Sequence, residues 1–152
     1  MEIRDVDGQQ YVRLTPVSYQ FATATDSYDR NWLMIRGSAQ SSNEKWSFID
    51  ASLLTGEAQN LTSWLRAMAR REAKTMAPGA AEPTWSNIEP NLGMGVVRYD
   101  DEHTALRVFL RQESAPPSSP ETEYFLDLRV TSAMLEEAAE TWAAELEAFP
   151  PR

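Results

Sequence analysis

The spacing of the apolar residues changes twice along this chain from every second residue to every third or fourth, and this limits the fold more than any other feature. Alternation over 11–21, 32–39 and 45–50 predicts three strands. The next stretch, 53–73, carries apolar residues at 4-3-4-3 spacing, which predicts one amphipathic helix. The apolar stripe of that helix consists of Leu54, Ala58, Leu61, Leu65 and Met68.

The second half of the chain repeats this order of strands followed by a helix. The stretch 93–113 predicts a hairpin whose turn is 100–103. A further strand is expected over 123–130, after a proline-rich loop at 115–121. The last helix is expected over 131–149, because apolar residues recur there at helical spacing.

Residues that cap helices stand at the start of both predicted helices. Thr55 and Ser132 are of the types whose side-chain oxygen accepts a hydrogen bond from a free backbone N–H group, so each is the expected N-cap. Glu57, in the first turn, favours the positive end of the helix dipole.

This order of elements predicts a single α+β domain over residues 1–152. Short connections favour antiparallel pairing, because parallel crossovers need a dozen or more residues. We therefore expect a mainly antiparallel sheet of about six strands, with a central and a C-terminal amphipathic helix packed on it. A chain of 152 residues is long enough to bury a core without cross-links.

Composition excludes several classes of site and compartment. The chain has no cysteine, so disulfides, thiolate metal sites and cysteine nucleophiles are excluded. No apolar run approaches the roughly 18 residues of a membrane span, and the N-terminus lacks the pattern of a signal peptide. These features predict a cytoplasmic protein that has no membrane partner.

The net charge of −9 is concentrated in the last third of the chain. Residues 1–99 carry 11 acids and 10 bases, whereas residues 100–152 carry 12 acids and 4 bases. Nucleic-acid binding needs a basic surface, so this distribution argues against it. A basic protein partner is the natural complement, although the solubility of a small domain explains the same excess.

No motif in the chain predicts catalysis, a cofactor or a metal. There is no glycine-rich phosphate loop, no nucleophile elbow and no cluster of histidines. The one histidine, His103, lies in the acidic turn 100–103, which is more typical of a solvated turn than of a cation site. No spacing among the 23 acids singles out a catalytic pair. We therefore expect a protein that is not an enzyme.

Two polar or aromatic segments allow a binding role as well as a structural one. Trp85 lies in 82–93, which has no clear period, so we expect it to be exposed and available to stack on a small ligand or carbohydrate. Asp29 and Asn31 precede a predicted strand and are turn-forming residues, so we interpret them as scaffold.

Three stretches together resemble the WapI-type immunity proteins of bacterial contact-dependent toxin systems. They are YDRNWL (28–33), DASLLTGEAQNLTSWL (50–65) and IEPNLGMGVV (88–97). The resemblance extends over roughly residues 10–152. The chain departs from the expected pattern at Ala51, where we expect proline, and at Gly56 and Ile88, where we expect aromatic residues. These departures leave room for a different partner.

The resemblance implies a cytoplasmic antitoxin without enzyme activity. Such proteins bind the toxic C-terminal domain, often a nuclease, of a large secreted or wall-associated toxin. We expect this partner to be basic and to contact acids of the last third of the chain. The expected contact residues are Asp100, Asp101, Glu102, Glu136, Glu140 and Glu147. The alternatives are a protein-interaction domain without a toxin partner and a module that binds a small ligand or carbohydrate.

Overall fold

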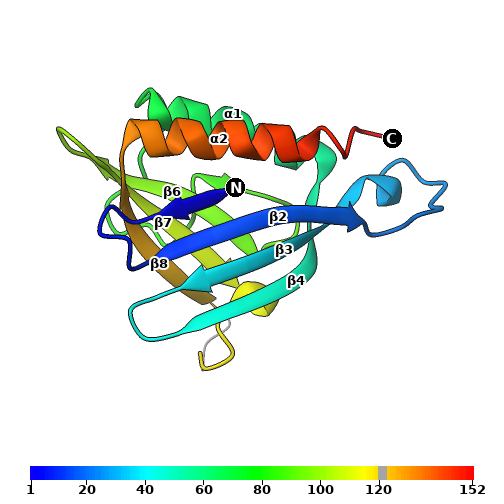
Figure 1. Ribbon diagram of the computed structural model, residues 1–152, viewed down its shortest axis with the longest axis horizontal. Coiled ribbons are helices and arrows are strands. Elements are labelled where there is room, and N and C mark those ends of the chain that lie inside the picture. The colour runs from blue at the N-terminus through cyan, green and yellow to red at the C-terminus, as the bar shows by residue number, and fades with distance from the viewer. Residues whose placement is uncertain (120–122) are drawn as a thin grey trace.

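The computed structural model describes residues 1–119 and 123–152, and in this part of the chain the strands form two antiparallel sheets of four (Figure 1). The first sheet consists of β1 (Glu2–Arg4), β2 (Tyr11–Tyr19), β3 (Trp32–Gln40) and β4 (Lys45–Leu54), in that order. The second consists of β5 (Trp85–Ser86), β6 (Leu92–Tyr99), β7 (Thr104–Arg111) and β8 (Glu123–Val130). The helices are α1 (Thr55–Ala69) and α2 (Ser132–Leu146), and the short 3₁₀ turns are η1 (Asp29–Asn31) and η2 (Gln112–Ser114).

The α+β fold is confirmed, but the expectation of one six-stranded sheet is wrong. All six predicted strands form, and α1 carries the chain from the end of the first sheet to the start of the second. The structure adds β1 and β5, which have three and two residues and are too short to show an alternating pattern. Pro120 and Glu121 of the predicted loop 115–121 lie outside the described residues.

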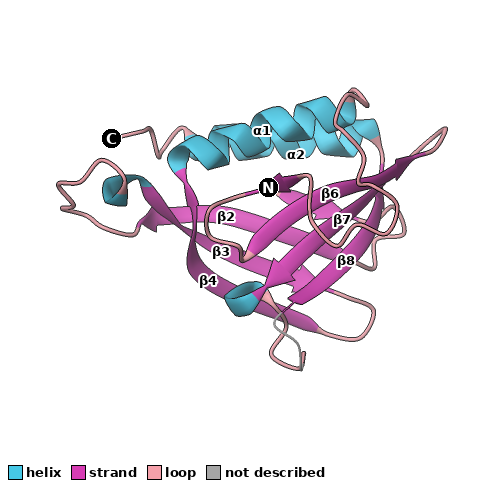
Figure 2. Cartoon of the chain, turned by 180° about the vertical axis from the view of Figure 1, so that it is seen from behind, coloured by secondary structure: helices cyan, strands magenta, loops and turns pink. Residues whose placement is uncertain are grey.

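The two sheets face each other and meet along both sides (Figures 1 and 2). On one side, the backbone N–H of Val6, just after β1, donates to the carbonyl of Arg129 in β8 at 3.0 Å. On the other side, Trp46 Nε1 in β4 donates to the carbonyl of Ser114 in η2 at 2.9 Å. A continuous hydrophobic core therefore fills the space between the sheets.

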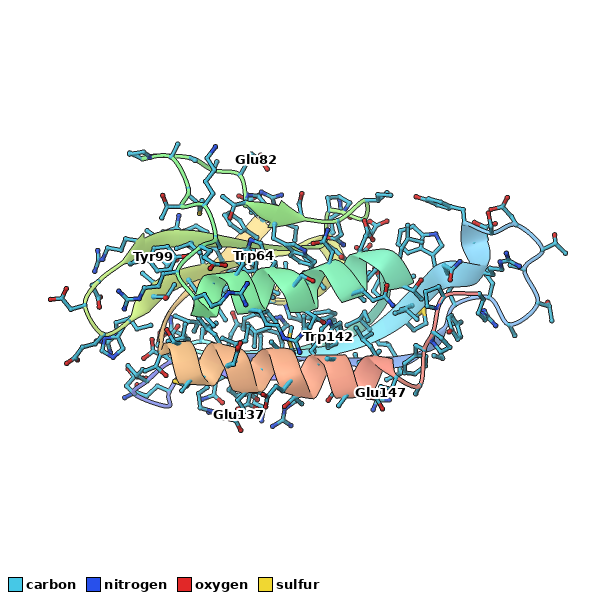
Figure 3. All side chains as sticks on the ribbon, turned by 90° about the horizontal axis from the view of Figure 1, so that it is seen from above. Trp64, Glu82, Tyr99, Glu137, Trp142 and Glu147 are labelled. Carbon is cyan, nitrogen blue, oxygen red and sulfur yellow. The ribbon has the colours of Figure 1, made fainter. Side chains whose placement is uncertain are left out.

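The helices α1 and α2 lie side by side and cover one side of the sheet pair (Figure 3). Ala58, Leu61, Leu65 and Met68 of the predicted stripe are buried on α1, whereas Leu54 ends β4 and is only partly buried. Leu61 and Leu65 are fully inaccessible to solvent. Trp142 of α2 is also fully buried, and its Nε1 donates to the carbonyl of Ala58 at 2.8 Å. Burial of each such apolar side chain contributes about 2 kcal/mol, so this stripe holds the helix pair on the sheets. Neither helix in the described residues is long and apolar enough to cross a membrane.

Both helices are capped one residue earlier than predicted. Leu54 is the N-cap of α1, and its backbone N–H donates to the Glu57 carboxylate at 2.8 Å. Thr131 is the N-cap of α2, where its Oγ1 accepts a hydrogen bond from the backbone N–H of Met134 at 3.2 Å. The cap of α1 thus comes from a carboxylate in the first turn, because the last residue of β4 has no polar side chain to supply it.

Candidate partner-binding surface

The acids of the β6–β7 turn form a solvated tip. The Asp100 carboxylate accepts hydrogen bonds from the backbone N–H groups of His103 at 2.7 Å and Glu102 at 3.1 Å. The bond from His103, followed by that from Glu102, lowers the pKa of Asp100. Arg71 donates to the carbonyl of Asp101 at 3.0 Å, which brings a cation to the same tip. In the described residues no group of three or more His, Cys, Asp or Glu side chains could hold a metal ion.

Three further acids lie along one stripe of α2. Glu136, Glu140 and Glu147 are four and seven residues apart, which places them within about 40° of one another around a helix. Glu147 and Arg66 of α1 line a groove of about 370 Å³ between the helices. Arg66 therefore places one positive charge across the groove from the acids of α2.

The structure does not bring these two groups of acids together. The turn 100–103 directly follows Tyr99, whereas Glu147 lies near the opposite end of the helix pair (Figure 3). A partner that touches both the turn 100–103 and Glu147 would have to extend along the length of α2, about 20 Å.

The three stretches 28–33, 50–65 and 88–97, which are far apart in the sequence, are joined by hydrogen bonds. Thr55 Oγ1 donates to Asn31 Oδ1 at 3.1 Å. The Glu57 carboxylate, which accepts from Leu54, also accepts from the backbone N–H of Ile88 at 2.7 Å. Asn31 thus connects η1 to the start of α1, in agreement with its predicted role as scaffold.

A second set of bonds joins β4 to the start of β6. Asn91 is fully buried, and its Nδ2 donates to Asp50 Oδ2 at 2.7 Å and to Ser52 Oγ at 3.0 Å. The hydroxyl of Ser114 donates to the carbonyl of Asn91, which fixes η2 beside the same strand. These bonds place Asp50, the segment that contains Glu89, and η2 around one recess.

This recess is an acidic pocket of about 260 Å³. It is lined by Gln20, Trp32, Asp50, Ala51, Glu89 and Glu113. Its three carboxylates come from β4, from the segment before β6 and from η2, and none of them forms an ion pair within 1–119 and 123–152. Trp32, half-buried at the start of β3, supplies an aromatic wall.

Exposed apolar side chains stand beside this pocket. Ile88 is 60% exposed and Tyr28 is 45% exposed. The Tyr28 ring contacts the Trp32 ring edge to face, with centroids 5.8 Å apart. Tyr28 and Glu57 also line a neighbouring pocket of about 350 Å³ at the start of α1. We name the whole region the β4-edge patch; it consists of Tyr28, Trp32, Asp50, Glu57, Ile88, Glu89 and Glu113.

The expectation that Trp85 is exposed is wrong. It is only 5% exposed, because β5 pairs with β6 and turns this side chain inward. Its ring lies 6.5 Å from that of Trp64 in α1. A stacking platform for a small ligand or carbohydrate therefore cannot be built on Trp85.

Comparison with known protein families identifies the family to which the chain belongs. The family model described as the immunity protein WapI-like family matches residues 3–150, which is nearly the whole chain. The chain belongs to the WapI-like immunity protein family. No match to a curated protein or to a solved structure was found. The resemblance of the three stretches is thus confirmed, and membership indicates an immunity role with a toxin protein as the partner in general terms.

In this WapI-like immunity protein, the β4-edge patch is a surface that sequence reasoning did not single out. Its acids Asp50, Glu89 and Glu113 are far apart in the chain, and no local pattern connects them. The only signal in the sequence was that the stretches 28–33, 50–65 and 88–97 all contribute to it.

Proposed function

We propose that this protein is an antitoxin that binds and covers the toxic C-terminal domain of a secreted or wall-associated bacterial toxin, inside the cell that makes both. The toxic domain in this proposal is a basic nuclease. The observation that carries the proposal is the net charge of −9 in a chain of an immunity protein family. A nuclease must present a basic surface to phosphates, and an acidic inhibitor complements that surface.

The positions of the predicted contact acids suit long-range electrostatic attraction of a basic partner. At the β6–β7 tip, Asp100, Asp101 and Glu102 are exposed, as are Glu140 and Glu147 on α2. Glu136 is partly buried beside them. Exposed charges of one sign raise the rate at which an oppositely charged partner collides in a productive orientation. In this proposal both groups steer the toxin domain, which does not require them to share one contact surface.

Co-expression tests this function directly. A toxic C-terminal domain from any toxin gene that neighbours the gene of this chain is expressed in a bacterium under tight control, with and without the immunity protein. We expect growth arrest without the chain, growth with it, and a one-to-one complex in gel filtration. A catalytically inactive toxin domain, expressed alone, controls for the burden of expression. Failure to rescue growth together with failure to form a complex would overturn the proposal and favour an interaction domain with another kind of partner.

A further inference from the structure

The acids of the β4-edge patch are distinct from those that the proposed function uses. Asp50, Glu89 and Glu113 meet in one pocket, whereas the steering acids lie on the β6–β7 tip and on α2. The fold fixes the segments that carry two of these acids: Asn91 bonds to Asp50, and Ser114, next to Glu113, is bonded to both Asn91 and Trp46. Three like charges held together without an ion-pair partner favour the arrival of a cation.

The walls of the pocket match one kind of cation in particular. Trp32 lines the pocket together with the carboxylates, and a guanidinium or ammonium group is attracted to the face of an aromatic ring as well as to a carboxylate. A guanidinium group also donates several hydrogen bonds in one plane, which suits carboxylates on more than one side. The volume of about 260 Å³ leaves room for such a side chain.

A buried acceptor lies behind the pocket. The carboxylate of Asp50 can only accept, so the amide of Asn91 must turn its Nδ2 toward it. The Asn91 Oδ1 atom is then left buried, and it has no hydrogen-bond partner in the described part of the chain. Buried acceptors are nearly always paired, and an ordered water molecule can supply this donor, because Asn91 itself does not line the pocket.

The rim of the pocket has the composition of an interface. Tyr28, which contacts the half-buried Trp32, and Ile88, which precedes Glu89 in the sequence, both expose large apolar side chains. Aromatic side chains next to a charged pocket are the usual anchors of protein partners. An acidic patch with an apolar rim therefore fits a basic protein surface.

We propose that the β4-edge patch is the docking surface for the partner protein and that its pocket receives a basic side chain, arginine or lysine, from that partner. The identity of the partner as a toxin domain rests on the proposed function. Tyr28 and Ile88 pack against apolar atoms around the inserted side chain, and Asp50, Glu89 and Glu113 pair with its charge.

A peptide titration tests the pocket without a toxin. The full chain, labelled with ¹⁵N, is titrated with acetyl-Gly-Arg-Gly-amide and with the same peptide carrying citrulline, which has nearly the same shape and no charge. We expect the arginine peptide to shift the Trp32 indole signal and the backbone signals of Asp50, Ala51, Glu89 and Glu113. The citrulline peptide is expected to bind at least about fivefold more weakly.

A matched pair of variants locates the binding. Glu89→Gln with Glu113→Gln removes two charges from the pocket, and neither side chain takes part in an ion pair of the described residues. The control, Asp7→Asn with Glu137→Gln, removes the same charge from two exposed positions outside the patch and the steering acids. We expect the first pair to weaken binding of the arginine peptide about fivefold and the second pair to leave it unchanged. Equal effects of both pairs, or equal binding of both peptides, would overturn the proposal.

The toxin domain gives an independent second measurement. If the wild-type chain binds the toxin domain and the Glu89→Gln, Glu113→Gln variant dissociates from it no faster, the docking surface is wrong and the antitoxin function stands. If the wild-type chain does not bind the toxin domain, the proposed function is wrong, and the peptide titration still decides whether the pocket takes a basic side chain.

Discussion

The Nδ2 atom of Asn91 donates a hydrogen bond of 2.7 Å to the Oδ2 atom of Asp50, and this bond joins the two sheets across 41 residues of sequence. A second bond from the same atom reaches the hydroxyl of Ser52 at 3.0 Å. Asn91 therefore holds the edge strand of the first sheet against the start of β6, and the acidic pocket forms at this junction.

Replacement of Asn91 by alanine tests this junction. The substitution leaves the Asp50 carboxylate and the Ser52 hydroxyl without their shared donor, so we expect the free energy of unfolding to fall by about 2 kcal/mol. Urea denaturation followed by tryptophan fluorescence measures the change. Asn60→Ala is the control, because Asn60 is exposed on α1, and we expect it to change stability by less than about 0.5 kcal/mol. Equal losses in both variants would contradict a special role of Asn91.

Substitution of two glycines, one in the first sheet and one in α1, tests how tightly each is packed. A Cβ atom added to Gly37 in β3 would lie 2.0 Å from the ring of Phe48, whereas one added to Gly56 in α1 meets nothing within 4 Å. We expect Gly37→Ala to destabilise the fold by about 1–3 kcal/mol, because the ring of Phe48 must move within the core. We expect Gly56→Ala to stabilise it by about 0.5 kcal/mol, since alanine favours a helix. Thermal unfolding of both variants checks the opposite signs.

The carboxyl group of Asp5 makes the free energy of unfolding depend on pH. Burial alone would raise the pKa of this carboxyl, but hydrogen bonds from the backbone N–H groups of Arg129 and Asp7, with the charge of Arg129, lower it below its ordinary value. Because the pKa of Asp5 is lower in the folded protein than in the unfolded protein, the ionised carboxylate stabilises the fold at pH values above its ordinary pKa of about 3.9. This stabilisation is lost as the pH falls through the pKa that Asp5 has in the folded protein.

We therefore expect wild-type stability to fall more steeply between about pH 5 and pH 2 than that of Asp5→Asn. Urea midpoints across this range measure the two slopes. Asp101→Asn, which removes one carboxylate from the exposed β6–β7 tip, is the control and should keep the wild-type slope. A slope for Asp5→Asn as steep as that of the wild type would show that Asp5 does not supply this stability.

The periodicity of the sequence predicted those elements whose pattern is long enough to be seen. The strands β2, β3, β4, β6, β7 and β8 each have eight to ten residues, and the part of the predicted stripe that lies in α1, from Ala58 to Met68, is buried as predicted. The strands β1 and β5 were missed because three or two residues cannot show alternation. The same shortness hid the inward position of Trp85.

Contacts between distant parts of the chain divide the strands into two sheets and also form the β4-edge patch. The alternating pattern of a strand does not show which strands will pair with it. The position of β4 at the edge of the first sheet could therefore not be predicted from its period. Likewise, Asp50, Glu89 and Glu113 are ordinary acids in their own segments and become a pocket only when Asn91 and Ser114 bring those segments together.

Association rates distinguish steering acids from docking acids. We expect Glu140→Gln with Glu147→Gln to slow association with a basic toxin domain about threefold to tenfold at low salt, and to flatten the dependence of that rate on salt, because attraction over distance is lost. Dissociation should change little. For Glu89→Gln with Glu113→Gln we expect the reverse, with faster dissociation and a smaller effect on association, since these side chains act after contact. Stopped-flow or surface-based kinetics at two or more salt concentrations separates the two rates. If both pairs alter only association, the pocket acts by charge at a distance and receives no side chain.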